Sequence, residues 1–96
     1  MKQKVVTFED GTEIKLKSAT SGDYYNIMNN DAKLAEKSKQ LIYASIDTWN
    51  FKDKEGKDVP KTTANADKHI TADYLKKLNE AVEEVNGLSD TEKKTS

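Results

Sequence analysis

Two short runs of alternating residues, joined by an Asp-Gly step, constrain the fold of this chain most strongly. In VVTFEDGTEIKLK, residues 5–17, apolar and polar side chains alternate on both sides of Asp10-Gly11. Alternation with a period of two is typical of a strand with one buried face, and Asp-Gly is a preferred hairpin turn. We therefore expect a β-hairpin with strands at about residues 4–9 and 12–17.

The clearest helical pattern lies near the other end, in ITADYLKKLNEAVEEV, residues 70–85. Thr71 is a suitable N-cap, Asp73 suits the first turn, and Gly87 suits the position after the helix. One face of the predicted helix carries the apolar residues Ile70, Tyr74, Leu75, Leu78, Ala81, Val82 and Val85. This face is expected to pack on the hairpin and on the other helices.

Three further helices are expected between these segments. The first covers about residues 21–30 and starts from a capping sequence at Thr20-Ser21. The second covers about residues 32–49, and a short one at 62–68 has Thr62 or Thr63 as its cap. At 100° per residue, an arc of roughly 140° on the second helix holds an apolar stripe. The stripe consists of Leu34, Ala35, Leu41, Ile42, Ile46 and Trp49, with Ser38 and Ser45 between them.

Trp49 and Pro60 are the expected structural anchors around the polar segment 50–61. Trp49 closes the apolar stripe, so we expect it to be largely buried and to hold the end of its helix against the final helix. The segment after it is expected to be a loop or a short hairpin around Gly56, with Val59-Pro60 as an extended exit.

Three tyrosines are the candidate partner-binding residues. Tyr43 falls in the polar arc of the second helix, so it requires either a tertiary neighbour or a binding partner, and the pattern favours neither. Tyr24 and Tyr25 form the other candidate pair. Tyrosine is favoured at protein interfaces because it provides a large contact area and keeps a polar tip.

The sequence predicts one small α+β domain over residues 1–88, an N-terminal β-hairpin followed by three to four α-helices, with a disordered polar tail at 89–96. The formal net charge is −1, and all 16 basic residues are lysines. This balance favours neither a nucleic-acid nor a membrane partner, and no apolar run is long enough for a signal peptide or a transmembrane span.

No pattern of catalytic, cofactor-binding or metal-binding residues is present. The chain has no cysteine, and its one histidine, His69, is expected to be an ordinary residue beside a helix cap. An EF-hand loop centred on Gly56 would place Phe51 and Thr62 at ligand positions, so that match fails. We therefore expect a binding or assembly protein that is not an enzyme and has no cofactor.

The order of three segments gives a resemblance to a known family. LIYASIDTW is followed by DKEGKDVPKT and then by TADYLKKLNEAVEEV. This order resembles the small tail assembly chaperones of long-tailed bacteriophages over roughly residues 40–85. The matching positions are Trp49, Asp53, Gly56, Pro60 and Thr62.

The resemblance implies binding to the phage tape measure protein, a long and largely helical chain that sets tail length. Such a chaperone keeps that chain soluble while tail tube subunits polymerise around it, which makes the tail tube protein a second candidate partner. It works in the host cytoplasm and is absent from the mature virion. A homo-oligomer is compatible with this role.

Two other functions stay open. The chain is also compatible with a structural tail or head–tail connector component that is retained in the virion. A small cytosolic regulatory binding protein is the other alternative.

Overall fold

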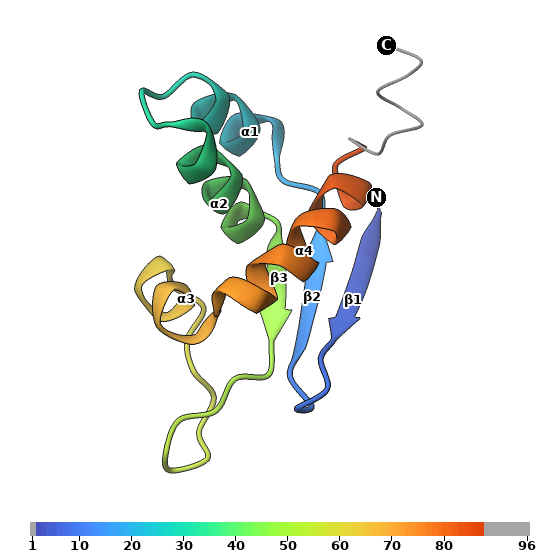
Figure 1. The fold of residues 1–96 in the computed structure, drawn as a ribbon, viewed down its shortest axis with the longest axis vertical. Helices are drawn as coiled ribbons and strands as arrows, with labels where there is room; N and C mark the ends of the chain where they lie inside the picture. The colour runs from blue at the N-terminus through green and yellow to red at the C-terminus, as the bar shows by residue number, and fades with distance from the viewer. Residues whose placement is uncertain (1, 88–96) are drawn as a thin grey trace.

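The computed structural model describes residues 2–87, so the tail expected at 89–96 lies outside the described residues. A three-stranded antiparallel sheet lies beneath helix α4, while α1 and α2 form a helical hairpin at one end and α3 lies at the side (Figure 1). The elements are β1 (Gln3–Thr7), β2 (Glu13–Lys17), α1 (Ser21–Met28), α2 (Leu34–Ala44), β3 (Ile46–Trp49), α3 (Thr63–His69) and α4 (Ala72–Val85). The predicted α+β class is confirmed.

The N-terminal hairpin forms as predicted. β1 and β2 pair antiparallel with Val6 opposite Ile14, so both apolar side chains face the same side of the sheet. The backbone N–H of Phe8 donates to the carbonyl of Thr12 at 2.8 Å, which closes the turn. Gly11 has φ +89°, a left-handed conformation that glycine adopts without a steric penalty.

The prediction of one helix over residues 32–49 is wrong beyond residue 44. α2 ends at Ala44, and Ile46–Trp49 form the strand β3, which pairs antiparallel with β2 and makes the sheet three-stranded. The carbonyl of Ser45 accepts a hydrogen bond from the backbone N–H of Lys17 at 2.8 Å. The free edge of β2 thus provides hydrogen-bond partners for the backbone of residues 45–49, in place of the partners that a further helical turn would provide.

A β-bulge explains why the helical period misled the prediction. Ile46 and Trp49 are three residues apart, as on one face of a helix, yet they pair with Leu16 and Ile14, which are only two residues apart. The pairing register shifts between Lys15 and Leu16 to accommodate the extra residue of β3. The two apolar side chains therefore share one face of the strand despite their helical spacing.

The core lies between the sheet and the apolar face of α4, as the period of α4 predicted. Ile14 and Leu16 from β2 are fully buried, and so is Leu78 at the centre of α4. Thr71 is the N-cap of α4, and its hydroxyl accepts a hydrogen bond from the N–H of Tyr74 at 3.3 Å. α4 packs on β1, β2 and α2.

The helices α1 and α3 also begin where the sequence predicted. The hydroxyl of Thr20 accepts from the N–H of Asp23 at 3.2 Å at the start of α1. At the start of α3, Thr62 rather than Thr63 is the cap, and it accepts from the N–H of Asn65 at 3.1 Å. Side-chain caps of this kind satisfy backbone donors that have no partner inside the helix.

Trp49 anchors the connection between β3 and α3 rather than the end of a helix. Its indole is partly buried, its Nε1–H donates to the carbonyl of Val59 at 2.8 Å, and its ring meets Phe51 edge-on at 5.1 Å. The prediction that Trp49 holds the end of a helix against α4 is therefore wrong, because Trp49 lies on β3 and donates its hydrogen bond to the segment that leads to α3. The carbonyl of Pro60 accepts from the N–H of Thr62 at 3.0 Å, so Pro60 leads directly into α3.

The polar segment between them forms a short hairpin, one of the two expected forms. Lys52 and Asp58 make an isolated antiparallel bridge. Inside it, the carboxylate of Asp53 accepts hydrogen bonds from the N–H groups of Glu55 at 2.8 Å and Lys57 at 3.0 Å. Gly56 provides the left-handed residue of this turn with φ +80°.

Candidate functional site

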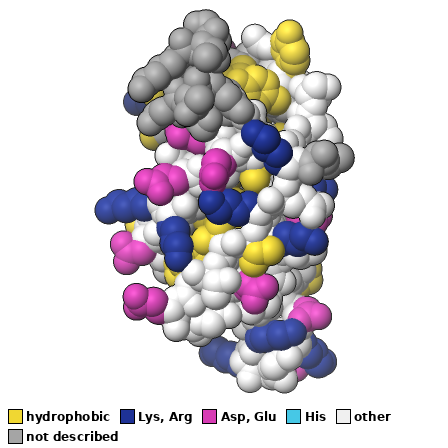
Figure 2. Space-filling model, turned by 90° about the vertical axis from the view of Figure 1, so that its right-hand side faces the viewer, with side chains coloured by type: hydrophobic (Ala, Val, Ile, Leu, Met, Phe, Trp, Pro, Cys, Tyr) yellow, Lys and Arg dark blue, Asp and Glu magenta, His cyan; other side chains and the backbone are white. Residues whose placement is uncertain are grey.

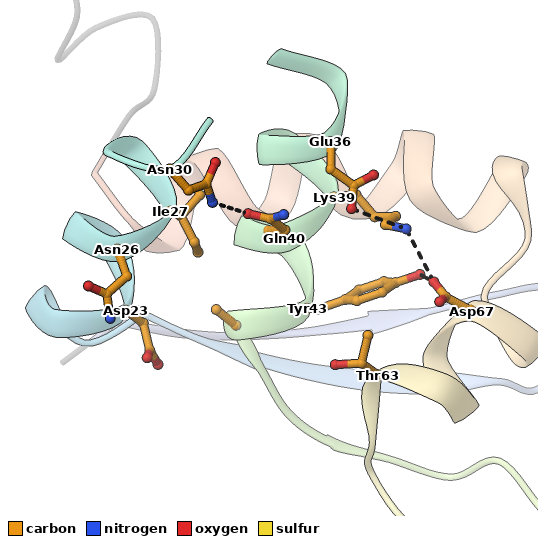
Figure 3. Close-up of a pocket in the computed structure, with 11 residues that line it drawn as sticks. Asp23, Asn26, Ile27, Asn30, Glu36, Lys39, Gln40, Tyr43, Thr63 and Asp67 are labelled. Atoms are coloured by element: carbon orange, nitrogen blue, oxygen red, sulfur yellow. Dashed lines mark hydrogen bonds and ion pairs between the residues drawn. The ribbon is translucent and has the colours of Figure 1, made fainter. Parts of the chain in front are cut away.

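A hollow of about 560 Å³ opens between α1, α2 and α3 (Figure 3). Its floor is apolar and is formed by Ile27, Ala44 and the ring of Tyr43. Polar side chains from all three helices form its rim (Figure 3). We refer to this region as the interhelical hollow.

The α1 side of the interhelical hollow is made of a carboxylate and two amides. Asp23 and Asn26 come from α1, and Asn30 follows its end. The Nδ2 of Asn30 donates to the Oε1 of Gln40 on α2 at 2.7 Å, which links the two helices across the hollow. Asp23 is exposed and takes part in no ion pair among residues 2–87.

On the α3 side, two side chains of α2 converge on the carboxylate of Asp67 (Figure 3). The hydroxyl of Tyr43 donates to the Oδ1 of Asp67 at 2.9 Å, and the Nζ of Lys39 lies 3.4 Å from the same oxygen. Lys39 also pairs with Glu36 at 3.5 Å. These contacts connect α2 with α3, although β3 and the segment after it separate the two helices in the sequence.

The shared carboxylate changes the acidity of its partners. Burial, and then the hydrogen bond to Asp67, raises the pKa of Tyr43 to about 12. The same hydrogen bond, followed by Lys39, holds the pKa of Asp67 below its ordinary value. The hydrogen bond with Asp67 also raises the pKa of Lys39. At neutral pH, the arrangement is therefore a neutral phenol and an ammonium on one carboxylate.

Replacing Tyr43 by phenylalanine is expected to lower the free energy of unfolding by about 1 kcal/mol at neutral pH, because a hydrogen bond to a partly exposed carboxylate is lost. The raised pKa means that the hydroxyl ionises in the unfolded chain from about pH 10 but in the folded chain only near pH 12. The contribution of the hydroxyl is thus complete below pH 10 and is lost as the pH rises to 12. Urea unfolding of both proteins across this range tests it, and a stability difference that stays constant would contradict it.

Tyr43 has the tertiary neighbour that its position on a polar arc required. The residue is partly buried and packs against the core, with its hydroxyl on Asp67. Its ring is also the floor of the interhelical hollow. A role in partner binding stays a prediction, and any test has to separate it from the stabilising role of the Asp67 contact.

A second surface lies on the opposite side of α1 and α2. At helical spacing, Tyr25 and Met28 on α1 point away from the interhelical hollow, and so does Leu34 at the start of α2. Tyr25 is 68% exposed and Leu34 is 80% exposed, while Met28 is 39% exposed. We refer to these three exposed side chains of the α1–α2 hairpin, with the neighbouring Tyr24, as the apolar face.

The predicted pair Tyr24 and Tyr25 lies on this apolar face, beside a shallow hollow of about 400 Å³. Tyr24 is partly buried against the core and Tyr25 projects outward. Ser18, Ala19 and Asn86 complete the hollow. On the face shown in Figure 2, hydrophobic side chains reach the surface near the upper end and again among the charged side chains lower down.

The structure separates the residues named from the sequence into different regions. Tyr43 lies at the interhelical hollow, Tyr24 and Tyr25 lie on the apolar face, and Trp49 and Pro60 lie in the connection between β3 and α3. The structural anchors therefore do not contribute to either surface. His69, expected to be an ordinary residue, stacks on Phe51 at 5.2 Å between ring centroids.

The sequence reading missed the carboxylates around the interhelical hollow. Thr63 and Asp67 are four residues apart and share one face of α3. That spacing was a usable signal. The pairing of Asp67 with Tyr43 has no local signal, because 24 residues separate them.

Within residues 2–87, no three histidine or acidic side chains are arranged to hold a metal ion, and no helix is long and apolar enough to cross a membrane. No protein-family model, curated protein or solved structure significantly matches this chain.

Proposed function

We propose that this protein is a tail assembly chaperone of a long-tailed bacteriophage. It binds the tape measure protein in the host cytoplasm and keeps it soluble while the tail tube assembles. It carries out no covalent chemistry and leaves before the virion is mature.

The observation that carries the proposal is the apolar face. Only 34% of the chain is hydrophobic, yet Tyr25, Met28 and Leu34 are all exposed on the α1–α2 hairpin. Val5 on β1 is the other large hydrophobic side chain that is exposed within residues 2–87. Grouped exposed apolar side chains mark interaction surfaces more often than single ones do.

The resemblance to the chaperone family concerns the architecture rather than this surface. Of the matching residues, Trp49 bonds to the returning chain, Asp53 and Gly56 form the turn, and Thr62 caps α3. Each of them shapes the connection between β3 and α3. The resemblance therefore supports a similar connection between sheet and helices. The proposed binding surface lies elsewhere, on α1 and α2.

The chemistry of such a partner fits the apolar face. Long helices with apolar stripes self-associate unless the stripes are covered, and a helix recognises an apolar surface through residues spaced three and four apart. Tyr25 and Met28 are three residues apart on α1, and the flexible thioether chain of Met28 adapts to different partners. By covering one apolar stripe at a time, the protein would keep a tape measure chain soluble, and this requires no nucleotide hydrolysis.

Replacing both Tyr25 and Leu34 by serine is expected to remove most capture of the tape measure protein while the domain stays folded. Exposed aromatic and aliphatic contacts of this kind contribute roughly 1–2 kcal/mol each to binding, and their high exposure makes them minor for folding. The measurement is co-expression with the tape measure protein of the same phage, scored as the soluble fraction of that protein, beside thermal unfolding of the variant.

Val5→Ser is the matched control, because Val5 is an exposed apolar residue on β1, away from the α1–α2 hairpin. It should leave capture intact. A wild-type protein that fails to keep the tape measure chain soluble would disprove the chaperone function. Detection of the protein in purified virions by mass spectrometry would favour a structural tail component instead.

A further inference from the structure

We propose that the interhelical hollow binds a basic amphipathic helix of the partner, with its apolar residues on the floor and a lysine or arginine at the rim. The proposal deepens the proposed function, because it names a second contact surface and the charge of the segment that occupies it. It does not involve the apolar face on the other side of the helical hairpin.

The shape of the interhelical hollow suits a helix. Its floor is formed by Ile27 on α1 and by Tyr43 and Ala44 at the end of α2, and α1 and α3 lie on either side of α2 (Figure 3). At about 560 Å³, it has room for several side chains of one helical face. An amphipathic helix placed along α2 would bury its apolar stripe on this floor.

The charge at the rim is unbalanced and negative. Asp23, Glu36 and Asp67 contribute three carboxylates, and Lys39 alone is positive, which leaves a local net charge of −2 in a chain whose total is −1. Lys39 is already paired with two of these carboxylates, at 3.5 Å and 3.4 Å. Its charge is therefore compensated, and Asp23 is left with no cation among the described residues.

A second feature, independent of these side chains, points to a cation in the same place. α2 ends at Ala44 on the floor, and its last turn contains no basic residue. The carboxyl end of a helix carries a partial negative charge, which a nearby lysine or arginine usually offsets. A basic side chain from a partner would meet both this helix end and the carboxylates of the rim.

The ring of Tyr43 gives the cation a further contact. Lys39 already lies 5.7 Å from the centre of this ring. A lysine or arginine of the partner would approach the part of this ring that lines the interhelical hollow, since cations are attracted to the faces of aromatic rings. Complementary charge mainly sets which segment binds and how fast, while the floor provides apolar contact.

The test uses two designed helical peptides with the same leucine stripe, one flanked by lysines and one by glutamates. Their binding to the full chain is measured by calorimetry at low and at high salt. We expect the lysine peptide to bind at least tenfold more tightly at low salt, and this preference to shrink as salt screens the charges. Equal binding of the two peptides would overturn the proposal.

The variant Asp23→Asn/Glu36→Gln removes two rim charges and leaves Asp67 with its contacts to Tyr43 and Lys39. It is expected to weaken binding of the lysine peptide about fivefold, in the range of two partly exposed ion pairs. Glu55→Gln/Glu80→Gln is the control, because it changes the net charge equally at residues outside the interhelical hollow. Equal losses in both variants would show a general charge effect and would also overturn the proposal.

The two proposals fail in different ways. If the Asp23→Asn/Glu36→Gln variant keeps the tape measure protein as soluble as wild type and binds the lysine peptide unchanged, the inference is wrong and the chaperone function stands. If wild type prefers the lysine peptide through the interhelical hollow but does not keep the tape measure protein soluble, the chaperone function is wrong and the site stands. Thermal unfolding of each variant confirms that the domain is folded.

Discussion

Replacing Trp49 by alanine is expected to lower the free energy of unfolding by about 3 kcal/mol, near the lower end of the range for large aromatic residues. The indole is partly buried, so the effect stays below that of a fully buried ring. The substitution removes the packing on Phe51 and the hydrogen bond from Nε1 to the carbonyl of Val59. Urea unfolding followed by circular dichroism measures it, since the variant has lost the only tryptophan of the chain.

Trp49→Phe separates the two contributions. Phenylalanine retains an aromatic ring but has no donor for the carbonyl of Val59, a residue that is itself buried. Its expected cost is about 1 kcal/mol, the contribution of one hydrogen bond, plus a small loss of packing. Equal costs for phenylalanine and alanine would show that the ring does not pack as described, and no cost for either would refute the anchoring role.

Replacing Asn86 by alanine is expected to cost about 2 kcal/mol, because this one side chain joins three parts of the fold. Its Oδ1 accepts from the backbone N–H of Ala19 at 2.9 Å, ahead of α1. Its Nδ2 donates to the hydroxyl of Ser45 at 2.9 Å, at the end of α2, and to the carbonyl of Val82 at 2.9 Å within α4. Alanine would leave the N–H of Ala19 without this acceptor, and urea unfolding measures the loss.

A double-mutant cycle with Ser45→Ala isolates the contact between the two side chains. Ser45 is fully buried, and its hydroxyl also donates to the carbonyl of Leu41 at 2.8 Å. If Asn86 and Ser45 stabilise each other, the double variant should cost at least 0.5 kcal/mol less than the sum of the single variants. Additive costs would show that the contact contributes little and that the effect of Asn86 comes from its contacts with Ala19 and Val82.

The parts of the fold that were predicted correctly depend on local chemistry. Asp10-Gly11 determines the hairpin, because its turn and the flanking alternation are encoded within a few residues. The caps at Thr20 and Thr71 likewise bond to backbone groups three residues away. The face of α4 follows from its period, since the same residues are buried whichever surface covers them.

The candidate surfaces were predictable only in part. Tyr24 and Tyr25 were recognised as binding candidates, and the exposure of Tyr25 agrees with a surface role. The polar arc of α2 raised the question of what Tyr43 contacts but gave no answer. The carboxylates of the interhelical hollow come from three helices, so no single segment contains the signal for them.

By itself, the sequence determined a hairpin, three capped helix starts and one strongly amphipathic helix, because turns, caps and helical periods act within a few residues. Only the tertiary structure decided that Ile46–Trp49 form a strand, since their spacing of three fits a helix and a bulged strand equally well. The open edge of β2 settled that choice through backbone hydrogen bonds. It also decided that Tyr43 meets Asp67, because that contact depends on how α2 and α3 are placed by the shared core.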